Sequence, residues 1–152
     1  MHLALYQPDI PQNVGTLLRL GACLNVSIHV IEPCGFLMGD RKLKRAGMDY
    51  IDTAALIRHT SWTTYQAAPK GRIIALVPRI GTSFLDFTFQ ASDHLLLGQE
   101  SIGLPDDITA SADHVVSIPM HHGNRSLNVA IAGAIVLSEA LRQTQQFQEM
   151  RP

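Results

Sequence analysis

The amino-acid sequence predicts a single α/β domain built on a mostly parallel sheet with helices on both faces. Short runs rich in leucine and β-branched residues alternate with stretches of helical periodicity. Several of these runs are apolar throughout, as expected of strands that are covered on both faces of a sheet. No repeat, low-complexity segment or linker divides the chain, so we expect one domain over residues 1–152.

The amino-terminal half is expected to start as strand, helix and strand. His2–Tyr6 is a short apolar run typical of a buried strand. Pro11 then opens a helix to about Leu24, because proline suits a first helical turn and leucines recur on one face. Ser27–Ile31 predicts a second strand, and a short helix is expected over residues 41–46.

The second half of the chain continues this alternation. Ser61 is placed to cap a helix over Trp62–Ala67. Continuous apolar runs predict three further strands, at residues 72–77, 94–97 and 114–118. Two more helices are expected, one starting at Pro105 and one over residues 126–145 with Ser126 as its cap.

The composition indicates a globular protein of a reducing compartment. Hydrophobic residues make up 46% and charged residues 16% of the chain, which argues against disorder. The longest strongly apolar run, residues 127–137, is too short to span a bilayer, and the first residues do not read as a signal peptide. Cys23 and Cys34 lack metal-ligand spacing. We therefore expect a cytoplasmic protein with no metal and no membrane partner.

The net charge of −1 speaks against a broadly basic nucleic-acid-binding protein. Basic residues are nevertheless clustered, with four of them within five positions: Arg41, Lys42, Lys44 and Arg45. On this window alone a solvated helix face is the ordinary interpretation, and a local phosphate-binding patch is the alternative.

Three irregular segments follow predicted strands, where ligands bind in open α/β sheets. They start after residues 77, 97 and 118, and we expect them to line one pocket. Gly98 and Gly103 permit a tight turn and close approach of the backbone to a ligand. Arg125, directly before the last helix, favours an anionic group there. The adjacent His121 and His122 are read as surface residues rather than metal ligands.

These segments, in this order, resemble the motifs of the SpoU branch of the SPOUT RNA methyltransferases. The motifs are residues 11–19 (PQNVGTLLR), residues 98–105 (GQESIGLP), and residues 118–120 (IPM) with residues 125–128 (RSLN). The resemblance covers essentially the whole chain. The small size, with residues 31–33 (IEP) and 45–50 (RAGMDY), is similar to the branch that methylates the ribose of cytidine or uridine 34 in tRNA.

The resemblance implies a SPOUT-type α/β knot with a carboxyl-terminal trefoil knot, S-adenosylmethionine as cofactor, tRNA as substrate, and a homodimer whose active sites take residues from both subunits. By position in the motifs, it implies cofactor-binding roles for Leu76, Gly98, Ile118 and Ser126 and catalytic roles for Arg19, Glu100 and Asn128. The RNA-binding residues that we expect are Arg41, Lys44, Arg45 and Arg125.

Arg19 interrupts a leucine-rich helix face, where it either reaches solvent or anchors a phosphate. Because arginine stays protonated in proteins, we expect it to stabilise a developing alkoxide rather than act as a base. The base is Glu100, a phosphate or the carboxylate of the cofactor, and Glu100 is alternatively structural. Ala130-Ile131 and Ser138 depart from the pattern of the branch and leave the substrate open.

Three other functions remain open at this point. The first is a ribose methyltransferase for rRNA or another tRNA position, and the second is a non-catalytic RNA-binding or cofactor-binding dimer. The third is a hydrolase that uses Ser126 with His121 or His122. It ranks lowest because the sequence has no GxSxG nucleophile elbow.

Overall fold

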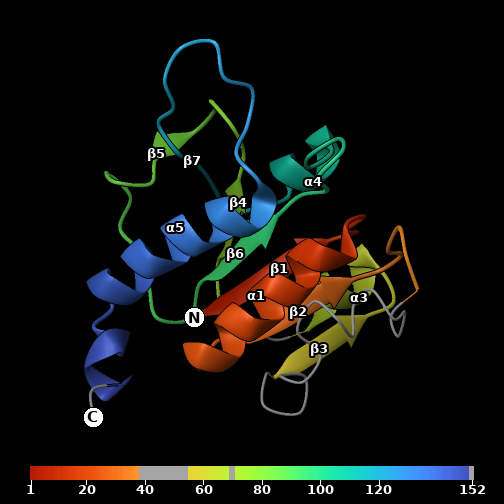
Figure 1. Cartoon of the computed structure of the whole chain (residues 1–152), viewed down its shortest axis with the longest axis horizontal. Helices are drawn as coiled ribbons and strands as arrows, with labels where there is room; N and C mark the ends of the chain where they lie inside the picture. The colour runs from red at the N-terminus through yellow and green to blue at the C-terminus, as the bar shows by residue number, and fades with distance from the viewer. Residues whose placement is uncertain (38–54, 69–70, 151–152) are drawn as a thin grey trace.

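The computed structural model describes residues 1–37, 55–68 and 71–150, and in these residues seven parallel strands form one sheet. The strand order is β3-β2-β1-β6-β4-β7-β5, and every neighbouring pair is parallel (Figure 1). This arrangement confirms the predicted α/β class. The strands are β1 (His2–Tyr6), β2 (Ser27–Ile31), β3 (Leu56–His59), β4 (Ile73–Leu76), β5 (Thr82–Ser83), β6 (His94–Leu97) and β7 (His114–Ser117).

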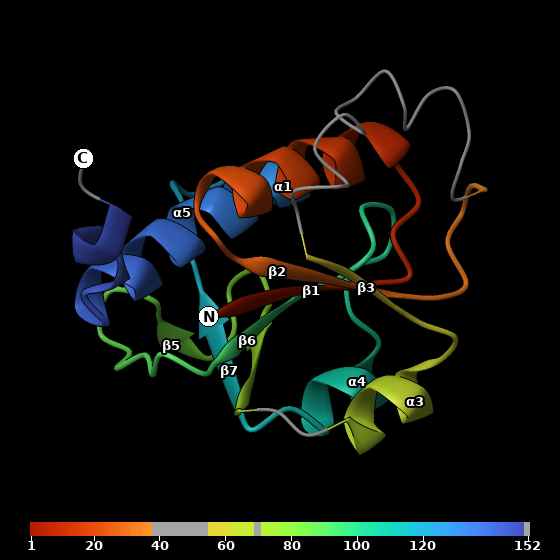
Figure 2. The same ribbon diagram turned by 90° about the horizontal axis from the view of Figure 1, so that it is seen from below.

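Helices cover both faces of the sheet, as predicted. α1 (Pro11–Cys23) and α5 (Val129–Gln143) lie side by side on one face, and α3 (Trp62–Ala67) and α4 (Asp106–Ala110) lie on the other (Figure 2). A 3₁₀ turn, η2 (Gln146–Met150), follows α5. None of the helices that the structure describes has the length and apolar character that a membrane crossing requires.

Side chains that alternate along the strands form two buried clusters, one on each face. Leu3, Leu5 and Leu97 point toward α1 and α5, whereas Ala4 and Leu96 belong to the cluster under α3 and α4. Each buried leucine stabilises the fold by about 1.5–3 kcal/mol relative to an exposed one. The alternation explains why these strands read as apolar throughout, since both of their faces are covered.

α5 approaches β6 closely because Gly133 faces the sheet. A Cβ atom at Gly133 would lie 2.8 Å from Cδ1 of Leu97, so a larger residue would require the Leu97 side chain to shift. This close packing holds the first turn of α5 above the end of β6, where the candidate site lies.

The predicted cap of α3 is confirmed, and the predicted cap of α5 is wrong. The hydroxyl of Ser61 accepts a hydrogen bond from the backbone N–H of Thr64 at 3.1 Å. α5 starts three residues later than expected, at Val129, and Asn128 is its N-cap instead of Ser126. The carboxamide oxygen of Asn128 accepts from two backbone N–H groups of the first turn, at 2.9 and 3.3 Å.

Other differences concern short elements. β3 and β5 were not predicted, and the helix expected over residues 41–46 lies outside the described residues. The strand predicted over residues 72–77 is shorter by one residue at each end. The trefoil knot that the resemblance implies stays a prediction.

Candidate functional site at the carboxyl edge of the sheet

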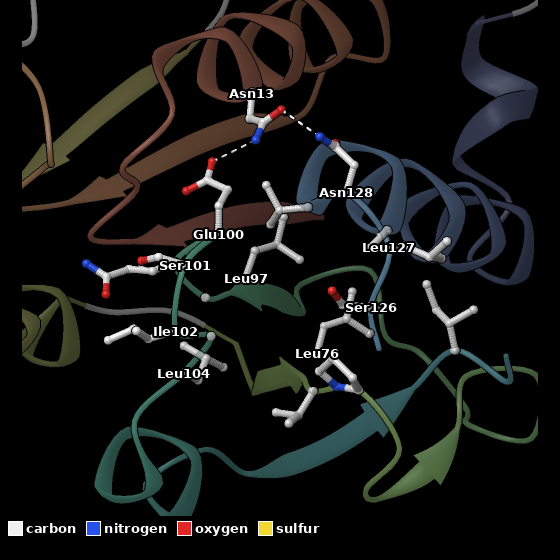
Figure 3. A pocket seen from close by; sticks show the side chains of 18 of the residues that line it. Asn13, Leu76, Leu97, Glu100, Ser101, Ile102, Leu104, Ser126, Leu127 and Asn128 are labelled. Carbon is white, nitrogen blue, oxygen red and sulfur yellow. Dashed lines mark hydrogen bonds between the residues drawn. The ribbon is translucent and has the colours of Figure 1, made fainter. Parts of the chain in front are cut away.

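A pocket of about 520 Å³ opens beyond the carboxyl ends of β4, β6 and β7. The segments after these strands, the start of α1 and the start of α5 together form its walls (Figure 3). This confirms that the three irregular segments meet at one pocket. Its lining includes Leu76, Val77 and Pro78 after β4, residues 98–104 after β6, and Ile118, Met120 and residues 126–129 after β7.

Backbone rather than side chains shapes the loop after β6. Gln99 and Gly103 exchange backbone hydrogen bonds at 3.1 and 2.9 Å, and Gly103 has a φ of 75°, which favours glycine. A Cβ atom on Gly98 would lie 2.4 Å from the carbonyl carbon of Gly103. The predicted tight turn is therefore present, with Gly98 packed against the backbone of its own loop, and the close approach of this backbone to a ligand stays a prediction.

Glu100 ties this loop to the segment between β1 and α1. One carboxylate oxygen accepts from the backbone N–H of Asp9 at 3.0 Å, and the other accepts from Nδ2 of Asn13 at 2.9 Å. The backbone N–H of Glu100 in turn donates to the carboxylate of Asp9 at 3.3 Å, and the hydroxyl of Ser101 donates to the same carboxylate. Both oxygens of Glu100 thus hold the pocket wall together.

Asn13 links Glu100 to the first turn of α5. Its oxygen accepts from Nδ2 of Asn128 at 3.0 Å while its own Nδ2 donates to Glu100 (Figure 3). Since Asn128 also uses its oxygen as the cap of α5, each amide in this chain has one orientation only. One continuous network therefore joins the start of α1, the loop after β6 and the start of α5.

Burial raises the pKa of Glu100, and the nearby Asp9 carboxylate raises it further, while the hydrogen bond from Asn13 opposes this shift. The pKa of Asp9 is lowered, chiefly by its interaction with Glu100 and also by the hydroxyl of Ser101. As the pH falls, Glu100 is consequently protonated before Asp9. The two hydrogen bonds that it accepts favour the structural role of Glu100 over a role as the free base.

The segment over residues 119–128 is exposed along most of its length. Ser126 and Leu127 are exposed yet line the pocket, so their solvent-facing surface is available to a ligand. The guanidinium of Arg79 donates to the carbonyl of Asn124, which anchors the tip of this segment to the turn after β4. Arg125 is exposed and lies outside the pocket lining.

Arg19 is exposed on α1, together with Gln12, Thr16 and Cys23 at helical spacing. In the part of the chain that the structure describes, the pocket lining does not include Arg19. A single chain therefore does not bring all the predicted catalytic residues into one cavity.

The structure thus separates the predicted site residues into three groups. Six of them line the pocket: Leu76, Gly98, Glu100, Ile118, Ser126 and Asn128. Arg19 and Arg125 are exposed and lie outside its lining. Arg41, Lys44 and Arg45 lie outside the described residues.

Asn13 belongs to the first motif, residues 11–19, but no role in the site was predicted for it. In the structure Ile10 is the N-cap of α1, and Asn13 is 8% exposed and stands at the centre of the polar network. A signal was available, because the helical spacing of Asn13 and Leu17 puts the asparagine on the buried face. Polar residues on such a face need partners.

The chain is therefore an α/β protein with an open parallel sheet and a site for a small ligand. A pocket lies beyond the carboxyl ends of the strands, and backbone turns and helix starts form its walls. The chain belongs to the SpoU rRNA Methylase family, whose sequence profile matches residues 1–138.

This chain is also similar, over nearly its full length, to individual proteins and solved structures. The tRNA (cytidine(34)-2'-O)-methyltransferase of Beijerinckia indica is 54% identical over 93% of this chain and 90% of its own length. A structure described as giving insights into the 2-OH methylation of C/U34 on tRNA superposes with a TM-score of 0.88 at 43% identity, covering 93% of this chain and 94% of the other.

A more distant structure contains the cofactor. It is the SpoU methyltransferase AviRb of Streptomyces viridochromogenes in complex with AdoMet, with a TM-score of 0.81 and 26% identity. The similarity covers 94% of this chain and 60% of AviRb.

Proposed function

We propose that this protein transfers a methyl group from S-adenosylmethionine to the ribose 2′-hydroxyl of nucleotide 34 in tRNA. The observation that carries the proposal is the pocket formed by the segments after β4, β6 and β7, in a chain 54% identical to a tRNA (cytidine(34)-2'-O)-methyltransferase. Family membership supports methyl transfer to RNA, and the high identity over nearly the full chain supports nucleotide 34.

The pocket suits S-adenosylmethionine in size and chemistry. Its volume lies within the range of roughly 300–1,000 Å³ usual for small-molecule sites. Leu76, Leu97 and Ile118 offer apolar surface for an adenine ring, and the exposed Ser126 offers a hydroxyl at the rim. When bound, the cofactor supplies a methyl group that its sulfonium already activates.

The polar network gives each side chain a positioning task. Asn128 caps α5 and, through Asn13, is linked to Glu100. These hydrogen bonds hold the start of α5, the start of α1 and the loop after β6 in fixed positions around a bound ligand. Ser126 exposes a hydroxyl at the pocket rim, where it is able to orient the ribose or the cofactor.

Arg19 completes the site from a second subunit. Its guanidinium stabilises the negative charge that develops on the 2′-oxygen as the proton leaves, which is the task expected of a fixed cation in a water-poor site. Because Arg19 lies outside the pocket lining of its own chain, the proposal requires a homodimer in which α1 of one subunit reaches the pocket of the other.

The surface of the α1 and α5 layer is suited to such a dimer. Four large apolar side chains there are 37–53% exposed: Ile10, Leu127, Ile131 and Ile135. Two of them lie at the pocket entrance, which places an apolar interface next to the site. Arg125 and the expected patch of Arg41, Lys44 and Arg45 would bind RNA phosphates.

The function is tested by methyl transfer onto total tRNA from a strain that lacks this protein, followed by mapping of the modified nucleoside. We expect 2′-O-methylcytidine or 2′-O-methyluridine at position 34. Modification of another tRNA position or of rRNA would reassign the substrate, and binding of cofactor without transfer to any RNA would identify a non-catalytic dimer.

Cofactor placement is tested by Gly98→Ala. The added Cβ would collide with backbone 2.4 Å away, so we expect at least a tenfold weaker binding of S-adenosylhomocysteine by calorimetry, about 1.4 kcal/mol. Gly123→Ala is the matched control: its φ of 93° also places strain on alanine, but Gly123 does not line the pocket, so the affinity for S-adenosylhomocysteine should stay at the wild-type value.

The shared active site is tested by mixing two inactive variants, Arg19→Ala and Gly98→Val. If one subunit supplies Arg19 to the pocket of the other, mixed dimers contain one intact site and the mixture recovers about a quarter of wild-type turnover. A mixture as inactive as its components would show that Arg19 acts on the pocket of its own chain.

A further inference from the structure

Four of the seven histidines gather on one face of the sheet, away from the pocket. His2 and His94 are the first residues of β1 and β6 and are direct partners in the strand register. His29 lies in the middle of β2, and His59 ends β3. All four contact one another or Tyr65 of α3, on the face opposite α1 and α5.

Three of these rings present nitrogen atoms to one small volume. One ring nitrogen from each of His2, His29 and His94 lies within 4.8 Å of the others. Nε2 of His29 and Nδ1 of His2 are 3.3 Å apart. Two nitrogens that bind one tetrahedral zinc ion at 2.0–2.1 Å are separated by roughly 3.4 Å, so this pair already has the spacing of two ligands.

In His29 and His94, the other ring nitrogen has a partner of the kind that orients a metal ligand. Nδ1 of His29 lies 2.9 Å from Nε2 of His59, and Nδ1 of His94 lies 3.0 Å from the hydroxyl of Tyr65. A hydrogen bond at one ring nitrogen fixes the tautomer and directs the other toward a metal. With Nδ1 of His94 held by Tyr65, Nε2 is the atom of that ring that would bind an ion.

We propose that His2, His29 and His94 form a site for a divalent transition-metal ion, best suited to Zn²⁺, that fastens β1, β2 and β6 together. Three imidazoles leave the fourth position of a tetrahedral ion to water. Hard cations such as Mg²⁺ and Ca²⁺ do not fit, because the cluster provides nitrogen and no carboxylate.

Binding requires one local movement. The rings of His2 and His94 are stacked, with centroids 4.2 Å apart and 15° between their planes. A metal ion lies in the plane of each ring that binds it, so the His2 ring must turn out of this stack. His2 is the second residue and only half-buried, whereas His29 and His94 are 7% and 3% exposed. The same exposure gives the ion a path from solvent.

The expectation of no metal rested on the cysteines and on the His121-His122 pair, and it did not consider this cluster. The histidines come from separate strands, and only the parallel register brings them together. The proposed ion lies on the opposite face from the cofactor pocket. We therefore expect it to raise the stability of the fold and to leave methyl transfer independent of it.

The test is a titration of the untagged full chain, with its native amino terminus, by Zn²⁺ in a calorimeter and by Co²⁺ in visible absorption. We expect one ion per chain, a tetrahedral Co²⁺ spectrum, and a rise in Tm of about 5–10 °C at a hundredfold excess over the Kd. His2→Ala should lose this binding while keeping its circular dichroism and its cofactor affinity.

Two comparisons make the result decisive. The double variant His121→Ala/His122→Ala keeps the cluster and should bind the ion as the wild type does. Nitrogen-detected NMR of the wild type should show shifts at the rings of His2, His29 and His94 and none at His114. The proposal is overturned if no stoichiometric binding occurs, or if binding survives His2→Ala and disappears in the double variant.

Discussion

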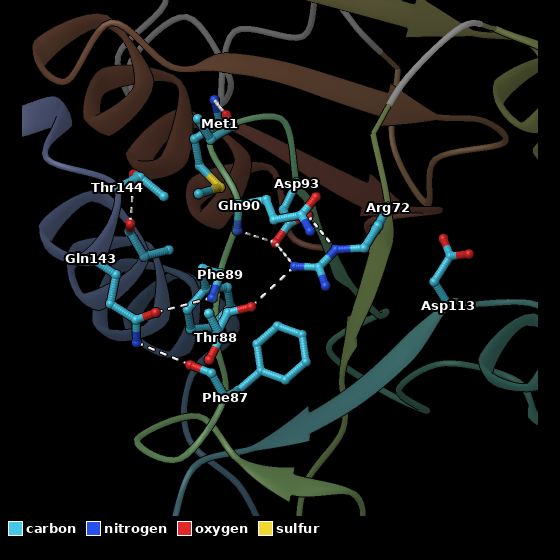
Figure 4. Close-up of polar contacts among 12 residues, drawn as sticks. Met1, Arg72, Phe87, Thr88, Phe89, Gln90, Asp93, Asp113, Gln143 and Thr144 are labelled. Atoms are coloured by element: carbon cyan, nitrogen blue, oxygen red, sulfur yellow. Dashed lines mark hydrogen bonds and ion pairs between the residues drawn. The ribbon is translucent and has the colours of Figure 1, made fainter.

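The two edges of the parallel sheet use polar residues in opposite ways. At the amino edge the polar groups bind one another: Asp93 is fully buried and accepts from Arg72 at 2.9 and 2.8 Å and from the backbone N–H of Gln90 at 2.8 Å (Figure 4). At the carboxyl edge the network of Glu100, Asn13 and Asn128 supports a pocket whose rim remains exposed. Polar residues of one edge stabilise the fold, and those of the other leave surface for ligands.

The amino edge also fastens the last helix to the sheet. Gln143 of α5 accepts from the backbone N–H of Phe89 and donates to the carbonyl of Phe87, both at 3.0 Å (Figure 4). Asp113 accepts from the backbone N–H of Ile73 at 2.7 Å. Substitutions at this edge should therefore change the free energy of unfolding, and substitutions at the carboxyl edge should change binding and turnover.

The largest effect is expected at Arg19. Arg19→Ala should reduce kcat by about 10²–10³-fold, the loss seen when a group that stabilises developing negative charge is removed. Cofactor affinity and Tm should stay close to wild type, because the side chain is exposed and outside the pocket lining. Single-turnover methyl transfer and calorimetry measure the two quantities.

Arg142→Ala is the control for this variant. It also removes an exposed cation, from the neighbouring helix α5, where Arg142 pairs with Glu139. Turnover of Arg19→Ala within tenfold of wild type would remove Arg19 from the proposed mechanism, and a loss in Arg142→Ala as large as that in Arg19→Ala would reduce it to a general charge effect.

The second effect is a loss of stability at the amino edge. Asp93→Ala leaves the guanidinium of Arg72 without its buried partner and should lower the free energy of unfolding by about 3 kcal/mol or more. The surface pair provides the contrast, since Glu139→Ala should cost about 0–1 kcal/mol. Urea denaturation measures both, and turnover per folded molecule should not change in either variant. A selective loss of turnover in Asp93→Ala would contradict the view that polar residues at the amino edge serve only stability.

Asn128 both stabilises the fold, as the cap of α5, and supports the pocket, through its hydrogen bond to Asn13. Its variants therefore test whether the two effects can be separated. Asn128→Ala removes the cap of α5 and should cost about 1 kcal/mol, while Ser126→Ala should cost almost nothing because Ser126 does not cap the helix. Asn128→Asp keeps an oxygen for the first turn but loses the donor to Asn13. We expect Asn128→Asp to retain stability and lose activity, as judged by urea denaturation and methyl transfer. Equal activity of Asn128→Asp and wild type would contradict the role of the network.

The sequence predicted the sheet well because β1, β2 and β6 are apolar on both faces and α1 has a clear start at Pro11. β3 was missed because Leu56–His59 mixes apolar and basic residues, and β5 because two residues carry no pattern. The pocket was predictable, since loops after parallel strands meet at one edge.

Contacts between distant segments were not predictable in the same way. Both Ser126 and Asn128 are good N-cap residues, and only the position of α5 against β6 decides between them. Arg72 and Asp93 directly precede two different strands, and His2 and His94 lie on different strands, so both pairings depend on strand order and register. Local patterns contain neither.

The last prediction concerns the alkylation rates of the two thiols, Cys34 and Cys23. It tests whether Cys34, in the segment after β2, is closed to solvent in the folded protein. Burial raises the pKa of Cys34 to about 11, with a smaller contribution from Glu32. At pH 8 only about one Cys34 in a thousand is then a thiolate, the form that reacts with iodoacetamide.

Cys23, at the end of α1, is exposed. We expect Cys23 to be alkylated much faster in the folded protein, as measured by mass spectrometry of peptides. Both thiols should react alike in urea, and comparable rates in the folded protein would mean that the segment after β2 opens to solvent.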